Sequence, residues 1–238
     1  MKKFSIQLED HLTNEVIQDS GGVCYVATAG ASAKVAIATS ASGAAATSNN
    51  PIALTNGRVE FWTADTVDTV DLYMQAPGGQ FVVAKSVSAS GPNELFVDTN
   101  NRNQTMVIPF DIADTTAATE TDTGFDEPAS AIMLPMPSVR VTTVDATETI
   151  DVGTDSTDSG DANGYLATVS VATAVVAKGT LASGGQTIGA LMSADESGAG
   201  VLVPEGHVSG EKSITYTLTA GTDTAVGFIA LPYLLTGA

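Results

Sequence analysis

Short apolar segments with an alternating pattern recur along the first third of the chain. In Arg58–Thr63, Val59 and Phe61 fall on one side of an extended backbone, while Glu60 and Trp62 fall on the other. Gly, Asn and Pro residues that favour tight turns separate this segment from its neighbours. The pattern predicts a compact antiparallel β unit, whose strands are VCYVATAG, AKVAIATS, GRVEFWTA, TVDLYMQA and QFVVAKSV.

A second group of apolar segments follows residue 105. Ile214, Tyr216 and Leu218 alternate with Ser and Thr residues, and the apolar segment VGFIALPY follows them as the second arm of a hairpin would. Residues 166–178 are open to two interpretations, a strand or a short helix, because Ala-rich apolar segments fit both. We expect this part of the chain to form a second β-sandwich, with the jelly roll as its candidate arrangement.

The segment between the two groups is irregular. Residues 89–105 combine Gly, Pro and Asn with little periodicity, which is typical of a connection between domains. The acidic, Thr-rich residues 113–130 are interpreted as an insertion-like loop of the second part. The sequence therefore predicts an all-β protein of two β-sandwich domains, residues 1–88 and 106–238, joined by a short linker.

Composition supports this fold and excludes several kinds of partner. β-branched and turn-forming residues are plentiful, whereas the long helix-forming side chains are scarce. With 27 acidic and nine basic residues the net charge is −18, so no basic stripe can follow a phosphate backbone, and we expect no direct nucleic-acid binding. No apolar segment approaches the roughly 18–20 residues of a membrane span, and residues 1–19 lack the apolar core of a secretory signal. No membrane partner and no export are expected.

Catalytic chemistry has little support in the sequence. The two histidines, His11 and His207, stand in polar or turn-like segments without an accompanying nucleophile, so both are expected to be exposed loop residues. Hydrolase, phosphate-binding and dinucleotide-binding motifs do not occur. The single cysteine, Cys24, is expected to pack as a small apolar side chain. We expect no catalytic residues, no cofactor and no enzymatic activity.

One acidic segment could hold a cation. Asp155, Asp158, Asp161 and Asn163 place oxygen atoms on a Gly-rich segment, and Ca²⁺ binds six to eight such oxygens. The spacing does not follow the EF-hand order. The alternative is that these side chains belong to a solvated loop without a metal.

Residues 33–79 resemble a small β-sandwich module of tailed-bacteriophage virion proteins. In that module an Asn-Pro pair, a short apolar segment and an Asn-Gly or Asp-Gly turn precede an aromatic strand and a strand ending in Gly-Gly. This chain departs from the module in keeping only Tyr73 of a Tyr-rich strand. The matching residues are Asn50-Pro51, Leu54, Asn56-Gly57-Arg58, Phe61, Val70-Asp71-Leu72 and Gly78-Gly79.

The C-terminal part is similar to small β proteins encoded among phage head genes, which are similar to capsid decoration or cement proteins. The resemblance implies a virion protein that is made in the host cytoplasm, binds the major capsid protein on the outer capsid surface, and bridges neighbouring copies of it, in some cases as a homotrimer. The alternative is a tail-fibre or baseplate component that binds host glycans. Trp62, on the face opposite to Phe61, is the candidate contact with a partner.

Overall fold

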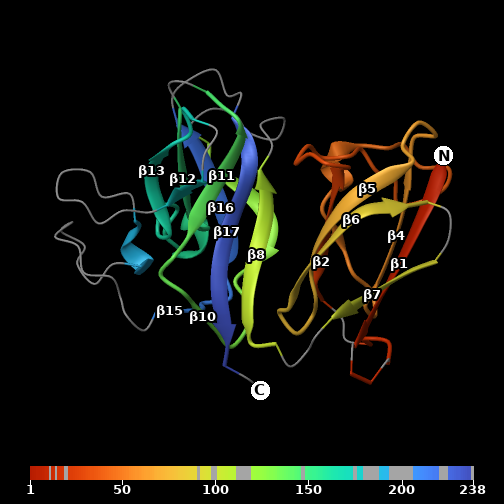
Figure 1. Ribbon diagram of the computed structural model, residues 1–238, viewed down its shortest axis with the longest axis horizontal. Helices are drawn as coiled ribbons and strands as arrows, with labels where there is room; N and C mark the ends of the chain where they lie inside the picture. Colours follow the sequence, from red (N-terminus) through yellow and green to blue (C-terminus); the bar gives the residue numbers. More distant parts are fainter. Residues whose placement is uncertain are drawn as a thin grey trace. The chain divides into compact units, whose positions relative to one another are not determined.

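The computed structural model describes residues 1–10, 12–13, 15–18, 21–89, 92–97, 101–110, 119–145, 148–173, 176–178, 188–192, 206–219 and 225–236 (Figure 1). The chain divides into two compact units, Met1–Asn101 and Arg102–Ala238. Both units are all-β, as predicted, and helix occurs in the described ranges only as three-residue 3₁₀ turns. None of these helical turns has the length or the apolar character that crossing a membrane requires.

Unit 1 is built from two sheets. In the first, β1 pairs antiparallel with β4 on one side and parallel with β7 on the other. In the second, every described pairing between neighbouring strands is antiparallel. The first sheet has the order β4 (Arg58–Thr63), β1 (Lys2–Asp10), β7 (Pro92–Val97), and the second β3 (Ile52–Ala53), β2 (Val23–Thr28), β5 (Thr69–Gln75), β6 (Phe81–Ser88).

The core of unit 1 lies between these sheets. Phe4, Ile6 and Leu8 alternate along β1 and are fully buried, and the Phe4 ring stacks on Phe61 of β4 with the ring centroids 5.1 Å apart. The predicted alternation of β4 is confirmed, because Val59 and Phe61 are buried and the residues between them are more exposed. Cys24 is fully buried in the same core.

Three segments of unit 1 differ from the sequence prediction. Residues 33–40, AKVAIATS, were predicted as a strand, but they form only isolated β-bridges, at Lys34, Ile37 and Ala38, and the Val35 carbonyl accepts from the Asn50 side chain instead of a neighbouring strand. Residues 2–10 were not predicted as a strand, yet they form the central strand of a sheet. The predicted linker, residues 89–105, contains β7 and the first residues of β8, so no free connection of that length exists. The Asn and Pro residues of this segment indicated a loop, but both residue types are tolerated in a short strand at a sheet edge, such as β7.

Unit 2 is a sandwich with the strand order of a jelly roll. One sheet runs β8, β17, β11, β14, and the other runs β9, β16, β12, β13, with every pair antiparallel. This is the arrangement of eight strands in two Greek keys. Its strands are β8 (Asn103–Phe110), β9 (Thr121–Asp126), β11 (Ser138–Thr143), β12 (Thr149–Thr154), β13 (Leu166–Ser170), β14 (Val176–Lys178), β16 (Ser213–Thr219) and β17 (Val226–Leu235).

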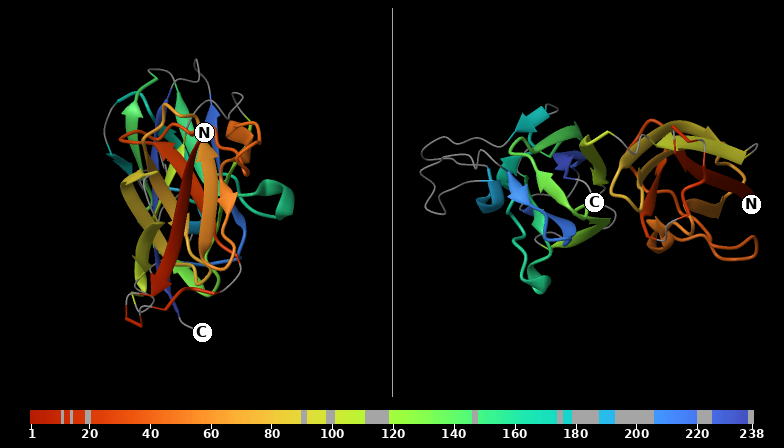
Figure 2. Two further views of the ribbon diagram at one scale, coloured as in Figure 1. Left: turned by 90° about the vertical axis from the view of Figure 1, so that its right-hand side faces the viewer. Right: turned by 90° about the horizontal axis from the view of Figure 1, so that it is seen from below.

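The two sheets of unit 2 face each other as layers (Figures 1 and 2). Phe110 of β8 contacts Tyr216 of β16 across the core, with the ring centroids 5.9 Å apart. Two short strands, β10 (Ala131–Met133) and β15 (His207–Val208), extend the first sheet beside the end of β17. The core therefore forms from the inward side chains of both layers, as the alternating pattern of β16 predicts.

The structure also resolves two sequence interpretations in unit 2. Residues 166–178, which fit either a strand or a helix, contain β13 and β14. Residues 113–130, interpreted as an insertion-like loop, contain β9, an edge strand whose alternate residues Thr123 and Phe125 are buried. Frequent Thr and Asp residues obscured this strand, because only one of its faces meets the core. Residues 113–118 of that interpretation lie outside the described ranges.

Candidate functional site

The stretch that carries the phage-module resemblance begins with a buried amide. The Asn50 side chain accepts a hydrogen bond from the Val26 N–H at 2.9 Å and donates to the Val26 and Val35 carbonyls at 2.6 and 3.0 Å. Asn50 is 2% exposed. It therefore connects β2 to the neighbouring irregular segment by satisfying backbone groups that would otherwise be buried without partners.

The Asn56-Gly57 pair forms the tight turn that was predicted. Both residues have positive φ, +51° and +64°, and Thr55 and Arg58 exchange backbone hydrogen bonds across them. A Cβ atom on Gly57 would lie 2.3 Å from the Ile17 carbonyl oxygen. Glycine is thus required here both by the backbone conformation and by the close approach of another segment.

A hollow of about 570 Å³ opens beside this turn. Most of its lining is polar, and its charged side chains neutralise each other, because Arg58 and Glu60 form an ion pair and Lys3 lies 3.0 Å from Glu60. The ion pair with Lys3 and Arg58 holds the pKa of Glu60 below its usual range. The lining residues are Gln7, Val16, Gln18, Thr39, Ile52, Ala53, Thr55, Asn56, Arg58, Val59 and Glu60.

Trp62, the candidate partner contact, lies outside the core of unit 1. Its ring is partly buried, and the Lys3 ammonium group lies 5.5 Å from the ring centroid. Its backbone exchanges hydrogen bonds with Ala38 at 2.8 and 2.9 Å. Its orientation opposite to Phe61 is as expected, and its role in binding a partner stays a prediction.

The acidic segment of unit 2 is a surface loop that hydrogen-bonds to itself. Asp155 Oδ1 accepts from the Thr157 N–H and hydroxyl at 2.8 and 2.7 Å and so caps a 3₁₀ turn. Asp161 Oδ1 accepts from the Asn163 N–H at 3.2 Å. Asp158 is exposed. Across the described residues, no three His, Cys, Asp or Glu side chains come together as metal ligands.

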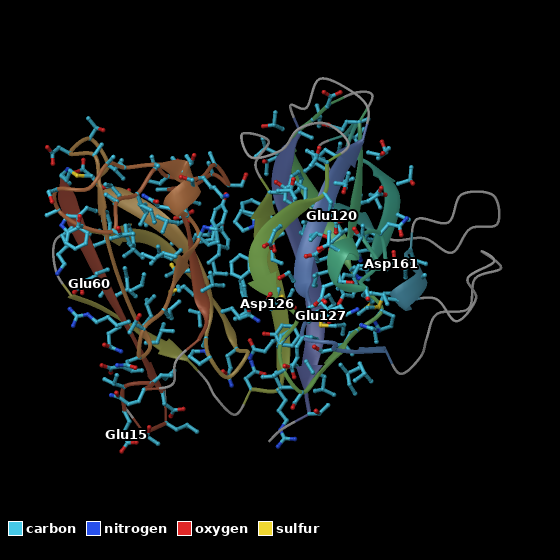
Figure 3. The ribbon with its side chains drawn as sticks, turned by 180° about the vertical axis from the view of Figure 1, so that it is seen from behind. Glu15, Glu60, Glu120, Asp126, Glu127 and Asp161 are labelled. Carbon is cyan, nitrogen blue, oxygen red and sulfur yellow. The ribbon has the colours of Figure 1, made fainter. Side chains whose placement is uncertain are left out.

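Glu120 connects this loop to the sandwich by hydrogen bonds. Its carboxylate accepts hydrogen bonds from the Ser156 N–H at 3.0 Å, from the Ser156 hydroxyl and from the Thr215 hydroxyl at 2.8 Å. Burial raises the pKa of Glu120, but these hydrogen bonds outweigh it and the pKa lies below its usual range. Figure 3 shows Glu120 and Asp161 on unit 2.

We expect Asp155→Ala to lower the thermal midpoint of unit 2 slightly, and by the same amount with Ca²⁺ as with a chelator. The carboxylate stabilises the loop through the Thr157 cap, which needs no cation. Thermal unfolding followed by circular dichroism measures this, with Asp158→Ala as the matched control because Asp158 caps nothing. A midpoint that rises with Ca²⁺ in the unmodified chain, and no longer rises in Asp155→Ala, would establish the cation site instead.

Unit 2 contains a buried carboxylate, directly after the edge strand β9, that the sequence did not single out. Glu127 is 2% exposed. One of its oxygens accepts a hydrogen bond from the Tyr165 hydroxyl and lies 3.3 Å from His207 Nε2. The other accepts from the Gly210 N–H at 2.7 Å and from the Lys212 N–H at 3.5 Å. Three chain segments, around residues 127, 165 and 207–212, therefore meet at this carboxylate; Figure 3 labels Glu127 on unit 2.

The electrostatics of this network favour an ionised Glu127. Burial raises its pKa, but hydrogen bonds from His207, Tyr165 and Gly210 outweigh burial and hold the pKa below its usual range. Burial and the adjacent Glu127 charge raise the pKa of Tyr165 well above its usual range. Because both carboxylate oxygens accept hydrogen bonds from the protein itself, the arrangement acts as a structural junction.

His207 differs from its sequence interpretation. It was expected to be an exposed loop residue, whereas it lies in β15, its side chain is 24% exposed, and its ring contacts Tyr165 edge-on. Nothing in the turn-like sequence around it signals this, because Glu127 and Tyr165 are distant in the chain. His11 lies outside the described residues.

Unit 1 contains a comparable buried network. Asp71 is 1% exposed and accepts hydrogen bonds from the Gly30 and Ser86 N–H groups at 2.9 Å and from Lys85 at 3.0 Å. Lys85 also donates to the Tyr73 hydroxyl. Burial raises the pKa of Asp71, but its three donors outweigh that effect and lower it. This network also stabilises the fold, since its members bond to one another and to the backbone.

Comparison with protein-family models finds no match, and comparisons with curated proteins and with solved structures find none either.

Proposed function

We propose that this chain is a non-enzymatic virion structural protein, a decoration or cement protein that binds the outer surface of a phage head and bridges neighbouring major capsid proteins. The observation that carries the proposal is the jelly-roll strand order of unit 2. Jelly rolls recur in viral capsid and lectin domains, so the fold agrees with the phage resemblance in the sequence. A fold is shared by many functions, and the proposal therefore needs a direct test.

The roles of the matching residues also support a structural protein. Asn50 bonds to buried backbone groups, Gly57 completes a tight turn, and Phe61 and Leu72 are fully buried in the core. The resemblance to the phage module is thus carried by residues that specify a scaffold. A repeated structural component needs such a scaffold more than it needs a reactive group.

The charge of the chain suits an external position on the head. A net charge of −18 keeps a concentrated protein soluble and is repelled by packaged nucleic acid. Many copies on one shell make modest individual contacts sufficient, since bound copies act together. The proposal includes assembly of the chain as a homotrimer on the head, as the resemblance to decoration proteins implies.

The second candidate is a tail-fibre or baseplate component that binds a host glycan. The polar hollow beside the Asn56-Gly57 turn favours it, because amides, hydroxyls and a charge-neutral ion pair can hydrogen-bond a sugar. Lectin domains also use the jelly roll. Binding would then depend on unit 1, and the copy number per virion would be small.

Gold-labelled antibody against this chain, imaged on purified virions by electron microscopy, tests the proposal. We expect label in many copies over the head. Virions from a phage in which the gene is deleted are the control for nonspecific label. A few copies at the tail would contradict the decoration role and favour the second candidate.

A further inference from the structure

The two sheets of the jelly roll in unit 2 differ sharply in charge. The six strands of the β17 sheet, all of them described, contain no Asp or Glu, and their charged side chains are Arg140 and Lys178. The opposite sheet carries Asp122, Asp126 and Asp151. In a chain with 27 acidic residues, this separation sets one layer of the sandwich apart from the other.

The outward side of β17 is also apolar, although the flanking strands place the polar Asn103, Thr105 and Ser138 beside it. β17 alternates strictly, with buried residues facing the core and apolar, partly exposed residues facing outward. The strand register places Arg140 beside Phe228, and Ile132 between Leu234 and Val208, of which Val208 is 72% exposed. We call this surface the acid-free face; its central members are Arg140, Phe228, Pro232, Leu234, Ile132 and Val208.

Such a face is unusual for a sheet layer that meets water. The outer face of an antiparallel sheet normally carries polar side chains, and a contiguous apolar surface marks an interaction site. Carboxylates are costly to desolvate, so a surface without them is the one that a very acidic protein can bury most easily. Arg together with aromatic and aliphatic residues is typical of the centre of an interface.

Charge indicates what covers the acid-free face. In the described part of the chain, Arg140 and Lys178 form no ion pair, and Arg140 is exposed. A second copy placed symmetrically on this face would bring these cations together and would add the repulsion between two chains of net charge −18. A different protein, apolar at the contact and with a carboxylate opposite Arg140, satisfies both the apolar and the charged requirement.

We propose that the acid-free face is the surface by which this chain docks onto the major capsid protein, through an apolar contact in which Arg140 pairs with a carboxylate of that protein. This inference rests on the proposed function, which it deepens by naming the docking surface. The acidic sheet of unit 2 then faces away from the shell. Bridging of neighbouring capsid proteins requires that the face span their junction.

Heads purified from the gene-deleted phage, mixed with the full chain and sedimented, test this inference. We expect Arg140→Glu and Val208→Glu to weaken binding by about tenfold or more, because each places a carboxylate in the contact. The matched control in unit 1, Val83→Glu, makes the same change as Val208→Glu at an exposed apolar position and should bind normally. Unchanged thermal midpoints establish that the variants fold; if Val208→Glu is destabilised, Arg140→Glu alone decides.

The other outcomes separate the inference from the proposed function. Normal binding by both face variants would overturn the docking surface and leave the decoration role intact. If only Trp62→Ala lost binding to heads, the contact would lie on unit 1, and the docking surface proposed on unit 2 would also be overturned. Failure of the unmodified chain to bind heads would overturn the decoration role, and the docking surface with it. A dimer in sedimentation velocity that Arg140→Glu dissociates would show a second copy on the face, against the proposal.

Discussion

Replacing Glu127 by Ala is expected to lower the free energy of unfolding of unit 2 by about 3–5 kcal/mol. The substitution removes the acceptor for the Tyr165 hydroxyl and the Gly210 N–H. Each buried donor left without an acceptor costs about 1–3 kcal/mol, and the vacated volume adds a cavity term. The effect is large because this one buried side chain joins the segments beside β9, β13 and β15.

Urea unfolding followed by circular dichroism measures this loss. Glu127→Gln is the matched variant, because it keeps the volume and one acceptor oxygen but turns an NH₂ group toward an N–H donor; its loss should be smaller, about 1–3 kcal/mol. Fluorescence of Trp62, the sole Trp, reports unit 1 and should keep its midpoint in both variants. A Glu127→Ala chain within about 0.5 kcal/mol of the unmodified one would contradict the junction.

The same network predicts a dependence on pH. The pKa of Glu127 is lower in the folded chain than in the unfolded one, so its contribution is fully present above its ordinary value of about 4.3. That contribution is lost as the pH falls through the folded value. The stability difference between the unmodified chain and Glu127→Gln should therefore shrink in acid and stay constant toward neutral pH. A difference that grows in acid would have the wrong sign.

Asn50→Ala is expected to have the second large effect, a loss of about 3–5 kcal/mol in unit 1. Three buried backbone groups of Val26 and Val35 lose their partner, and each costs about 1–3 kcal/mol when it is left unsatisfied, partly offset by water that can enter. Asn50→Asp keeps the size but loses both donated hydrogen bonds and sets a carboxylate against two carbonyl oxygens. It should therefore destabilise unit 1 at least as much as Ala does.

The Trp62 fluorescence transition in urea measures the Asn50 variants. Asn49→Ala is the neighbouring control: its side chain donates to the Ile37 carbonyl from a more exposed position, so its loss should be smaller. Glu127→Ala and Asn50→Ala are also controls for each other, since they act on different cores. An Asn50→Asp chain as stable as the unmodified protein would show that the amide donors contribute nothing.

The strands could be predicted wherever one face met a core. β4, β16 and β17 follow from alternation, and the turn at Asn56-Gly57 follows from its residues. β5 was also predicted as a strand, but every residue from Val70 to Gln75 is buried, so both of its faces are covered. β1 shows the same alternation, because Phe4, Ile6 and Leu8 are buried and the residues between them are polar, although the strand was not predicted. β7, with the sequence PNELFV, has no comparable alternation. Its pairing with β1 could not be predicted either, since it joins residues 87 positions apart, as between Ser5 and Pro92.

The buried networks could not be predicted in the same way. Glu127 lies 38 residues from Tyr165 and 83 from Gly210, and nothing near it in the sequence distinguishes it from the other acidic residues. The charge separation of unit 2 was equally hidden. It emerges only when strand order assigns β8, β11 and β17 to one sheet and β9, β12 and β16 to the other.

Each unit is closed by its own first and last strands, β1 with β7 and β8 with β17. During synthesis neither sheet can be completed until its final strand has left the ribosome, so unit 1 can fold before unit 2 is fully made. In unit 2, β17 lies between β8 and β11, so the backbone N–H and C=O groups along one edge of each of these strands have no partner until β17 is made. Pairings this distant in sequence fold slowly, which makes the nascent jelly roll the stage most exposed to aggregation.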